Sequence, residues 1–238
     1  MNRLVIKFPT RNRPDKFKIV FGRYLTFLGG QNDVRFIITL DEDDPTMNNP
    51  EMQHWLDTQN AQIDYFYGQS KSKIEACNAN LEGVDGDVLL LASDDMMPVQ
   101  MGYDDIIFSV FQNNFPNFDG AIKFWDGFRP KEDPLMTLPV IGFPLYRQFG
   151  YIYHPEYKSL YCDNEQTEVC AALNRLHSCD LCIIQHQWIG DPFDALHART
   201  ENAEMYEVDG ETFRRRAANK FNMEAMFNAP ANEVINPA

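Results

Sequence analysis

The 238-residue sequence lacks the long apolar segments that membrane-spanning and exported proteins carry. No run approaches the ~18 consecutive apolar residues of a membrane-spanning helix. The opening segment MNRLVIKFPTRNRP has no apolar core of the kind found in signal peptides. We therefore expect a cytoplasmic protein without a membrane span.

Basic residues are few. The chain holds 21 Lys and Arg against 35 Asp and Glu, which gives a formal net charge of −14. Because non-specific binding to nucleic acid depends on cations that neutralise phosphates, this balance disfavours such binding. A nucleic-acid substrate held in a local basic groove stays open, since residues 11–18 and 214–216 are locally basic.

Cysteine is also scarce, with five residues in the chain. An odd number without a signal peptide predicts free thiols in a reducing compartment. Cys179 and Cys182 form a C-x-x-C pair, but a structural zinc site needs a second ligand pair, and Cys162 and Cys170 match its spacing poorly. Free thiols are therefore favoured over zinc.

The strongest positive signal is a buried strand in the first half of the chain. Val88 to Leu91 form an apolar run, which is typical of a strand buried on both faces in a mostly parallel sheet. Further strands are expected over 4–8, 34–40, 63–67, 118–128, 138–143 and 181–185. Helices are expected over 15–28, 52–59, 70–81 and 144–150, and from residues 103 and 162. This alternation and the length predict one large α/β domain.

The buried run ends in Ser93, Asp94 and Asp95. Two adjacent carboxylates at the end of a buried strand are unfavourable unless they are paired, hydrated or bound to a cation. In open α/β sheets, ligands bind outside the carboxyl ends of the strands. We therefore interpret these acids as the floor of an active site, with a solvated acidic turn as the alternative.

The first two expected strands also end in charged residues. Thr10, Arg11 and Arg13 follow the first strand, and Asp41 and Asp43 follow the second. Guanidinium groups suit phosphate oxygens, although solvated loop arginines are the alternative. The acids could equally cap the helix that follows them.

The segment GQSKSKIEACNANLEGVDGDVLLLASDDMMP resembles the middle of family 2-like glycosyltransferases with the GT-A fold. In that family, a helix with Lys, Ala and Asn leads into a strand that ends in a DxD-type motif. Lys73, Ala76 and Asn78 stand at the matching places. The motif here is SDD, so Asp95 matches the metal-contact position, while the first acidic role falls to Ser93 or Asp94.

The order of the motifs extends the resemblance over roughly Leu4 to Phe221. It implies the GT-A nucleotide-diphospho-sugar transferase fold, a single α/β domain whose mixed, mostly parallel sheet is flanked by helices. The domain would cover residues 1–220, with a donor half at about 1–100 and an acceptor half at about 101–220. Residues 221–238 are rich in Asn, Ala and Pro and are expected to form a lid, a docking arm or a disordered tail.

The resemblance implies a site for a nucleotide-sugar donor. Its expected residues are Thr10, Arg11, Arg13, Asp41, Asp43, Lys73, Asn78 and Asp94. An acid at Asp41 or Asp43 would accept hydrogen bonds from the nucleotide base. Lys73 would meet a donor phosphate as a point charge, and a surface lysine is the alternative.

The resemblance also implies a divalent metal, Mn²⁺ or Mg²⁺, on Asp95 and Asp94, because carboxylate oxygens suit these hard cations. A histidine after the last core strand often completes the metal shell in this family; His186 fits that place and His197 is the second choice.

An acidic pair at the start of a late helix supplies the general base in this family. The usual pair is Glu-Asp, and Cys162 stands in place of the first acid here, which leaves Asp163 as the expected base and Glu165 as its rival. Acids at a helix start can also serve only as caps. Trp125 and Asp126, at the end of a strand, are expected to border the acceptor, although tryptophan more often packs in a core.

These expectations describe a metal-dependent hexosyl- or pentosyltransferase that uses a nucleotide-diphosphate sugar, with a UDP-sugar expected, and inverts by direct displacement. A glycan, a protein or a modified DNA base stays open as acceptor; compact enzymes of this kind resemble bacterial and phage-encoded ones, and in the phage case DNA bases are acceptors. A degenerate nucleotide-sugar-binding scaffold is one alternative. A nucleotidyltransferase ranks below it, because the chain has no Gly-rich phosphate loop with Lys.

Overall fold

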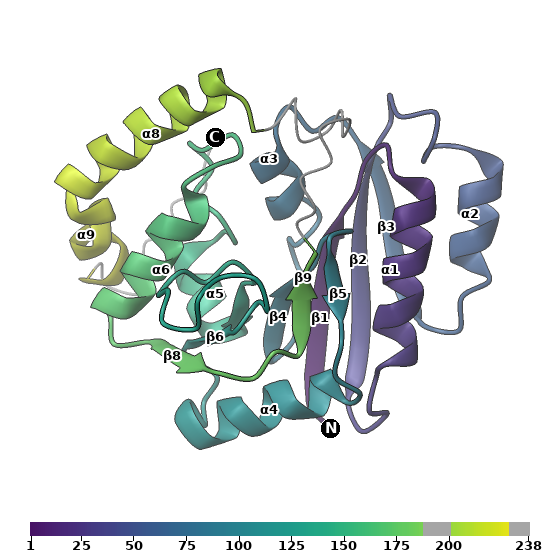
Figure 1. Ribbon diagram of the computed structural model, residues 1–238, viewed down its shortest axis with the longest axis horizontal. Helices are drawn as coiled ribbons and strands as arrows, with labels where there is room; N and C mark the ends of the chain where they lie inside the picture. Colours follow the sequence, from purple (N-terminus) through teal and green to yellow (C-terminus); the bar gives the residue numbers. More distant parts are fainter. Residues whose placement is uncertain (188–200, 229–238) are drawn as a thin grey trace.

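The chain folds around one mixed sheet of seven strands, and the computed structural model describes residues 1–187 and 201–228 (Figure 1). The strands are β1 (Arg3–Pro9), β2 (Asp33–Asp41), β3 (Gln62–Gly68), β4 (Val88–Leu91), β6 (Ala121–Phe124), β7 (Val140–Gly142) and β8 (Leu176–Cys179). They lie in the order β3-β2-β1-β4-β7-β6-β8. Neighbours are parallel except at β7, which runs antiparallel to both β4 and β6. The structure confirms the predicted mixed, mostly parallel α/β sheet.

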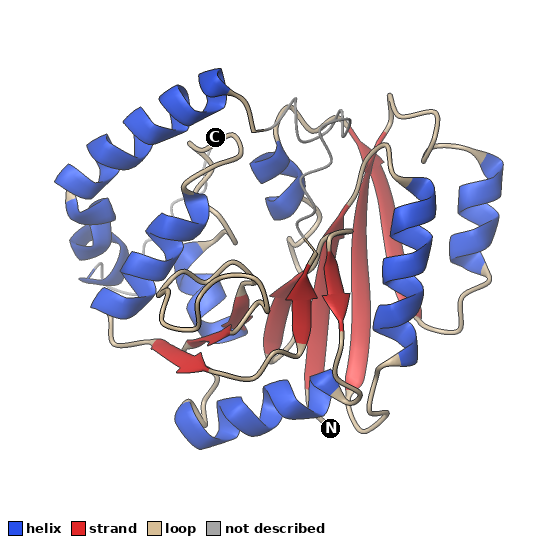
Figure 2. Cartoon of the chain, in the orientation of Figure 1, coloured by secondary structure: helices blue, strands red, loops and turns tan. Residues whose placement is uncertain are grey.

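Helices cover both faces of this sheet (Figure 2). On one face lie α1 (Pro14–Thr26), α2 (Pro50–Asp57) and α4 (Tyr103–Asn114). On the other face lie α3 (Lys73–Asn78), α5 (Phe143–Phe149) and α6 (Cys162–Ala172). The α3 helix is shorter than the predicted range 70–81, because the Ser72 side chain caps its start and Ala79 has an extended backbone. No helix within 1–187 or 201–228 is long and apolar enough to cross a bilayer.

The packing of α1 on β1 follows from the spacing of apolar residues. Phe17, Phe21 and Tyr24 recur at helical spacing and are fully buried. Phe8 of β1 meets all three rings at centroid distances of 5.2, 6.1 and 5.8 Å. This contact fixes the carboxyl end of β1, at the top of Figure 1, where the predicted donor loop begins.

Lys7 is a buried cation in the middle of β1. Its side chain is fully buried on the face that α3 covers, and its ammonium donates a hydrogen bond to Thr39 Oγ1. Thr39 in turn donates to Asn80 Oδ1 at 2.6 Å. Burial lowers the pKa of Lys7 from 10.5 to about 8. Folding therefore disfavours the charged form of Lys7 relative to the neutral form.

Lys7→Met is expected to raise the free energy of unfolding at pH 7, by at most roughly 3 kcal/mol, which is the value of a pKa fall from 10.5 to about 8. The folded pKa is the lower one, so between pH 8 and 10.5 the unfolded chain binds more protons and wild-type stability rises with pH. The advantage of the variant should therefore shrink across that window in urea titrations. Lys220→Met, at a side chain 77% exposed, is the control, and a pH-independent advantage of Lys7→Met would contradict the prediction.

A second sheet of two strands joins β5 (Met96–Pro98) and β9 (Ile184–His186) in antiparallel pairing. The sequence predicts a late strand over 181–185 that follows the core strands. The structure differs, because β9 belongs to this small sheet instead of the seven-stranded one. Its pairing with β5 places residues 184–186 beside the residues that follow β4.

The chain continues through α8 (Ala203–Ala218), η1 (Lys220–Asn222) and α9 (Met223–Asn228), on the side of the sheet away from α2 (Figure 1). Phe221 is buried, with its ring 5.7 Å from that of Phe213 on α8. The first part of the predicted tail is therefore packed against the domain, and the expected boundary at residue 220 falls inside a packed segment. Residues 229–238 lie outside the described part.

Buried ionic contacts hold α8 to α6. The Arg216 side chain donates to both carboxylate oxygens of Glu165 at 2.6 and 2.7 Å, and both residues are buried. Tyr157 donates to the same carboxylate at 2.8 Å. Each of these two buried charges is stabilised by the other instead of by water, so removing one leaves the other unpaired.

Arg216→Ala is expected to lower the free energy of unfolding by about 3–5 kcal/mol, because it leaves Glu165 buried without its cation. Urea denaturation followed by circular dichroism measures this loss. Arg215→Ala is the matched control: its partner Glu156 and its own side chain are both part-exposed, so the loss should stay below about 1 kcal/mol. Equal losses in the two variants would contradict the prediction.

Candidate active site

A cleft of about 730 Å³ opens at the carboxyl ends of β1, β2 and β4. The parallel strands end at the same edge of the sheet, where open α/β proteins bind their ligands. Nine of the residues predicted from the sequence line this cleft: Thr10, Arg11, Arg13, Asp41, Lys73, Asp94, Asp95, Asp163 and His186. The structure thus brings together side chains that are far apart in the sequence, such as Thr10 and His186, which are 176 positions apart.

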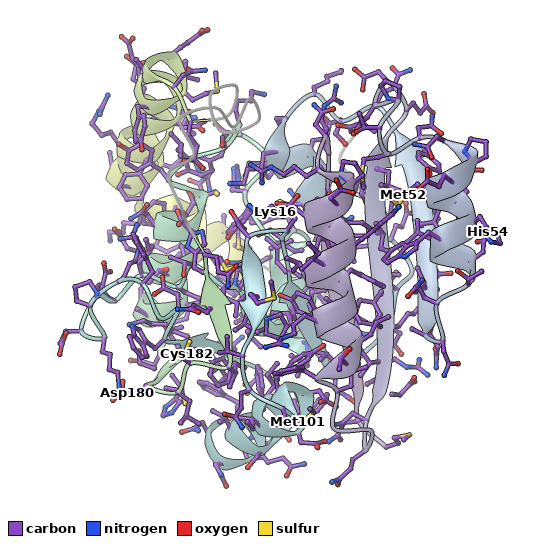
Figure 3. The ribbon with its side chains drawn as sticks, turned by 45° about the vertical axis from the view of Figure 1, so that its right-hand side comes forward. Lys16, Met52, His54, Met101, Asp180 and Cys182 are labelled. Carbon is purple, nitrogen blue, oxygen red and sulfur yellow. The ribbon has the colours of Figure 1, made fainter. Side chains whose placement is uncertain are left out.

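Asp94 is held by two residues of the loop after β1. Its Oδ1 lies 2.6 Å from Arg13 Nη1, and Thr10 donates to its Oδ2 at 3.3 Å. Burial raises the pKa of Asp94, and Arg13 and Lys16 oppose that rise. Figure 3 labels Lys16, which lies in the first turn of α1. Both carboxylate oxygens of Asp94 therefore have partners from the loop after β1.

Arg11 lies between two acids at the end of β2. Its Nη1 is 2.5 Å from Asp41 Oδ2 and 2.5 Å from Asp43 Oδ1. Asp41 is buried beside the cleft, whereas the Asp43 side chain is 73% exposed and does not line it. Of the two predicted acids, Asp41 therefore lines the cleft and Asp43 does not.

Asp95 and His186 face each other across the cleft floor, with His186 Nε2 at 3.7 Å from Asp95 Oδ2. The β5–β9 ladder causes this proximity, because Met96 pairs with His186 in its register. Backbone hydrogen bonds secure it: Gln187 N donates to Asp95 O at 2.7 Å, and His186 N donates to Asp126 O at 2.8 Å. Ser93 also donates to the Asp95 carboxylate.

Asp95 and His186 suit a hard divalent cation that takes its remaining ligands from the substrate. Among the residues described, no group of three or more His, Cys, Asp and Glu could hold a metal ion. Mg²⁺ is commonly bound by one or two carboxylates together with substrate phosphates and water, and Mn²⁺ accepts carboxylate and imidazole as well. Asp95 and His186 therefore supply two ligands of the right chemistry, and phosphate oxygens would supply others.

Asp163 lines the cleft from the first turn of α6. Burial raises its pKa, and the opposing effects of Lys73 and of the Asn164 N–H, which donates at 3.0 Å, do not cancel that rise. A carboxylate whose pKa is raised is a stronger base than an ordinary aspartate. The role of Asp163 as the base stays a prediction, with which its place in the cleft is compatible.

Lys73 lies among carboxylates at the start of α3. Burial acts to lower its pKa, but Glu201 and weaker neighbours outweigh burial, so the pKa is raised and the side chain stays charged. Glu201 Oε1 is 3.8 Å from Lys73 Nζ and lines the cleft. Glu201 stands in no motif and next to no apolar run, so the sequence does not indicate it as a site residue.

No family model and no curated protein sequence matches the chain, but solved structures do. The mannosyltransferase PcManGT from Pyrobaculum calidifontis, in complex with GDP-Man and Mn²⁺, has a TM-score of 0.65 at 12% identity over 83% of this chain and 60% of that chain. S. aureus TarS 1-349 in complex with UDP-GlcNAc has a TM-score of 0.61 at 15% identity over 87% of this chain and 64% of that chain. The fold is that of GT-A glycosyltransferases.

A third structure has the same fold. Glucosyl-3-phosphoglycerate synthase from Mycobacterium tuberculosis, in complex with Mn²⁺, UDP-glucose and phosphoglyceric acid, has a TM-score of 0.57 at 13% identity over 88% of this chain and 80% of that chain. The chain spans less than two thirds of PcManGT and of this TarS chain, at 60% and 64% of their lengths. At these identities the likeness shows that the chain has the GT-A fold and does not by itself show its activity.

Five of the predicted residues lie around the cleft and do not line it: Asp43, Asn78, Trp125, Asp126 and Glu165. Asn78 accepts the N–H groups of Ile152 and Tyr153 and donates to Tyr153 O at 2.7 Å. It therefore fastens α3 to the loop before α6, and this use competes with the predicted donor contact. Glu165 is committed to Arg216 and Tyr157, so its placement disagrees with the predicted rival role as base.

Trp125 and Asp126 shape a loop beside the cleft. Asp126 accepts the N–H groups of Phe128 and Arg129, both at 2.9 Å, and the Thr137 hydroxyl at 3.0 Å. Trp125 Nε1 donates to Arg129 O at 2.8 Å. Phe128, Arg129 and Thr137 line the cleft, so the two predicted residues border it through the loop that they hold.

The cysteines and His197 complete the list of predicted sites. All five cysteines are free, and Figure 3 labels Cys182 in the segment that leads to β9. Cys77 and Cys162 line the cleft, and burial raises the pKa of both thiols, that of Cys77 to about 11. They are therefore neutral at physiological pH. His197, the second choice as metal ligand, lies outside the described residues.

Proposed function

We propose that the chain is a metal-dependent glycosyltransferase that moves a sugar from a nucleotide-diphosphate sugar to a hydroxyl acceptor. The observation that carries the proposal is the pairing of Asp95 and His186 at 3.7 Å in a cleft at the strand ends of a GT-A fold. The named GT-A structures in complex with GDP-Man, UDP-GlcNAc and UDP-glucose support a nucleotide-sugar donor, and two of them contain Mn²⁺.

In this proposal Asp95 and His186 hold Mn²⁺ or Mg²⁺ against the donor diphosphate. A divalent ion there would offset the negative charge that develops on the leaving nucleoside diphosphate. Arg13 and Lys73 add fixed positive charge at the same cleft, and Arg13 also keeps Asp94 in place. Asp41, held by Arg11, is the acid that we assign to the nucleotide base, with a UDP-sugar as the expected donor.

Asp163 acts as the general base in this proposal. It removes the proton of the acceptor hydroxyl while the acceptor oxygen attacks the anomeric carbon and the bond to the diphosphate breaks. One displacement of this kind inverts the anomeric centre. The raised pKa of Asp163 supports the role, because a base works best when its pKa approaches the working pH.

The experiment that tests the proposal is release of nucleoside diphosphate from a panel of UDP-, GDP- and dTDP-sugars, with Mn²⁺ or with EDTA. Release from one donor that stops in EDTA is expected. Metal-dependent donor binding, measured by calorimetry, without release in the presence of candidate acceptors would favour a degenerate binding protein. Pyrophosphate release from a nucleoside triphosphate and a sugar phosphate would favour a nucleotidyltransferase. Absence of both binding and release across the panel would overturn the proposal.

A further inference from the structure

One wall of the cleft comes from the first turn of α8 and the residues just before it. Glu201, Met205 and Tyr206 line the cleft there. Asp209, one turn further along α8, is fully buried and accepts three backbone N–H groups, those of residues 158, 159 and 160, at 2.9, 2.8 and 2.7 Å. The wall therefore has a fixed position relative to the loop 158–160, which also lines the cleft.

Two aromatic rings are exposed at the cleft. Tyr206 is 52% exposed and Phe128 is 55% exposed, and both line the cleft. Each has a supporting ring: Tyr161 at 6.3 Å from Tyr206, and His186 at 6.2 Å from Phe128. Exposed aromatic rings in a cleft are typical of surfaces that bind a ligand through a flat apolar face.

Polar groups suited to hydroxyls lie on the same side. Ser159 is only 5% exposed, and its Oγ has no hydrogen-bond partner among the described residues. An unsatisfied buried hydroxyl is unfavourable, so a hydrogen bond from a ligand hydroxyl to it would be stabilising. Asp163 and Glu201 are carboxylates, which accept hydrogen bonds from hydroxyls.

The charges of this side favour an uncharged ligand. Two acids, Asp163 and Glu201, stand with three cations, Lys73, Arg129 and Lys158, on this part of the cleft lining, and Lys73 Nζ lies 3.8 Å from Glu201 Oε1. Arg129 is already paired with Asp133 at 3.0 Å. The chain as a whole carries a net charge of −14, which repels a polyanion such as DNA. The wall therefore has no surplus of positive charge for a phosphate.

We propose that this wall is an acceptor subsite for an uncharged sugar ring of a glycan. The ring binds against Phe128 and Tyr206, and its hydroxyls meet Asp163, Ser159 and Glu201. This assignment rests on the proposed glycosyltransferase function and narrows its acceptor from any hydroxyl compound to a neutral glycan. Glu201 thereby supplies a second carboxylate to the acceptor side, where Cys162 stands in place of the first acid of the usual acidic pair.

The test measures ligand binding and does not need turnover. Saturation-transfer NMR is recorded on the full chain with UDP and Mn²⁺, using a panel of neutral methyl glycosides and the corresponding sugar 6-phosphates. The variants are Tyr206→Ala and Phe128→Ala, with Tyr206→Phe as the control that keeps the ring. Calorimetric UDP binding in the same samples reports whether each variant is folded with an intact donor site.

At least one neutral glycoside is expected to bind, and its affinity should fall about tenfold in each alanine variant and stay within about twofold in Tyr206→Phe. UDP affinity should stay unchanged in all three. The subsite is overturned if UDP binds while no neutral glycoside does, if the phosphorylated sugars bind in preference, or if both alanine variants bind glycoside as the wild type does. Loss of UDP binding by the wild type would instead overturn the proposed donor site.

Discussion

Asp95→Asn is expected to lower metal-dependent release of nucleoside diphosphate about a thousandfold. The substitution keeps the size of the side chain and removes the negative charge that lies 3.7 Å from His186. A bound metal contributes several kcal/mol of transition-state stabilisation, and each 1.36 kcal/mol is a factor of ten in rate. Steady-state release with the donor identified in the panel measures the effect.

Two further measurements make this prediction specific to the metal. The Mn²⁺ concentration that gives half-maximal rate should rise in Asp95→Asn and, in the same direction, in His186→Ala. Asp64→Asn is the matched control, because it removes one carboxylate on β3 from a part-exposed ion pair with Arg35 of β2 and should leave the rate within about twofold. An Asp95→Asn enzyme with wild-type rate and wild-type sensitivity to EDTA would show that the metal, if any, binds elsewhere.

The gathering of Thr10, Arg13 and Asp94 at the cleft could be predicted from the sequence, because these residues follow apolar strands directly. Once Val88 to Leu91 are assigned to a buried parallel strand, the acids after them must lie at the same sheet edge as the loop after β1. Thr10, Arg13 and Asp94 meet there through direct contacts. Local sequence was sufficient because each residue stands within a few positions of its strand.

The proximity of His186 to Asp95 has a different origin. It depends on a ladder of two strands with three residues each, β5 and β9. Strands this short contain too few residues to show a period of two, so the sequence indicates a strand near residue 184 without its partner. The resemblance to a known family pointed to His186, and only the register of the ladder shows how it reaches the acid.

The α8 helix could not be predicted by the same reasoning. Its buried residues are Asp209, Gly210 and Arg216, and the apolar Phe213 and Ala217 on the same face are only partly buried, so the face shows a weak apolar period. Those polar residues are stabilised by contacts with residues 158–160 and Glu165, about 50 positions earlier in the chain. Glu165 was likewise open to misassignment, because an acid in the first turn of a helix looks the same whether it caps, catalyses or pairs with a distant arginine.

Asp163→Asn is expected to lower the turnover number by about 10²–10⁴-fold, the usual contribution of a general base. The amide cannot take the acceptor proton, while its size and its place in α6 stay the same. Affinity for UDP should change little, because Asp163 acts on the acceptor side. Glu168→Gln, an exposed carboxylate on the same helix, is the control and should keep the wild-type rate within about twofold.

The pH dependence separates a base from a structural acid. Burial raises the pKa of Asp163 above its ordinary value of 3.8, so the wild-type rate should fall, as pH decreases, with a midpoint above 3.8. The direction follows because only the deprotonated carboxylate accepts the proton, and a raised pKa moves its protonation to higher pH. In Asp163→Asn the residual rate should lose this acid limb, since no carboxylate titrates at that position. If the limb persists unchanged in the variant, another group is the base, and Glu201, the remaining acid of the acceptor wall, becomes the residue to replace.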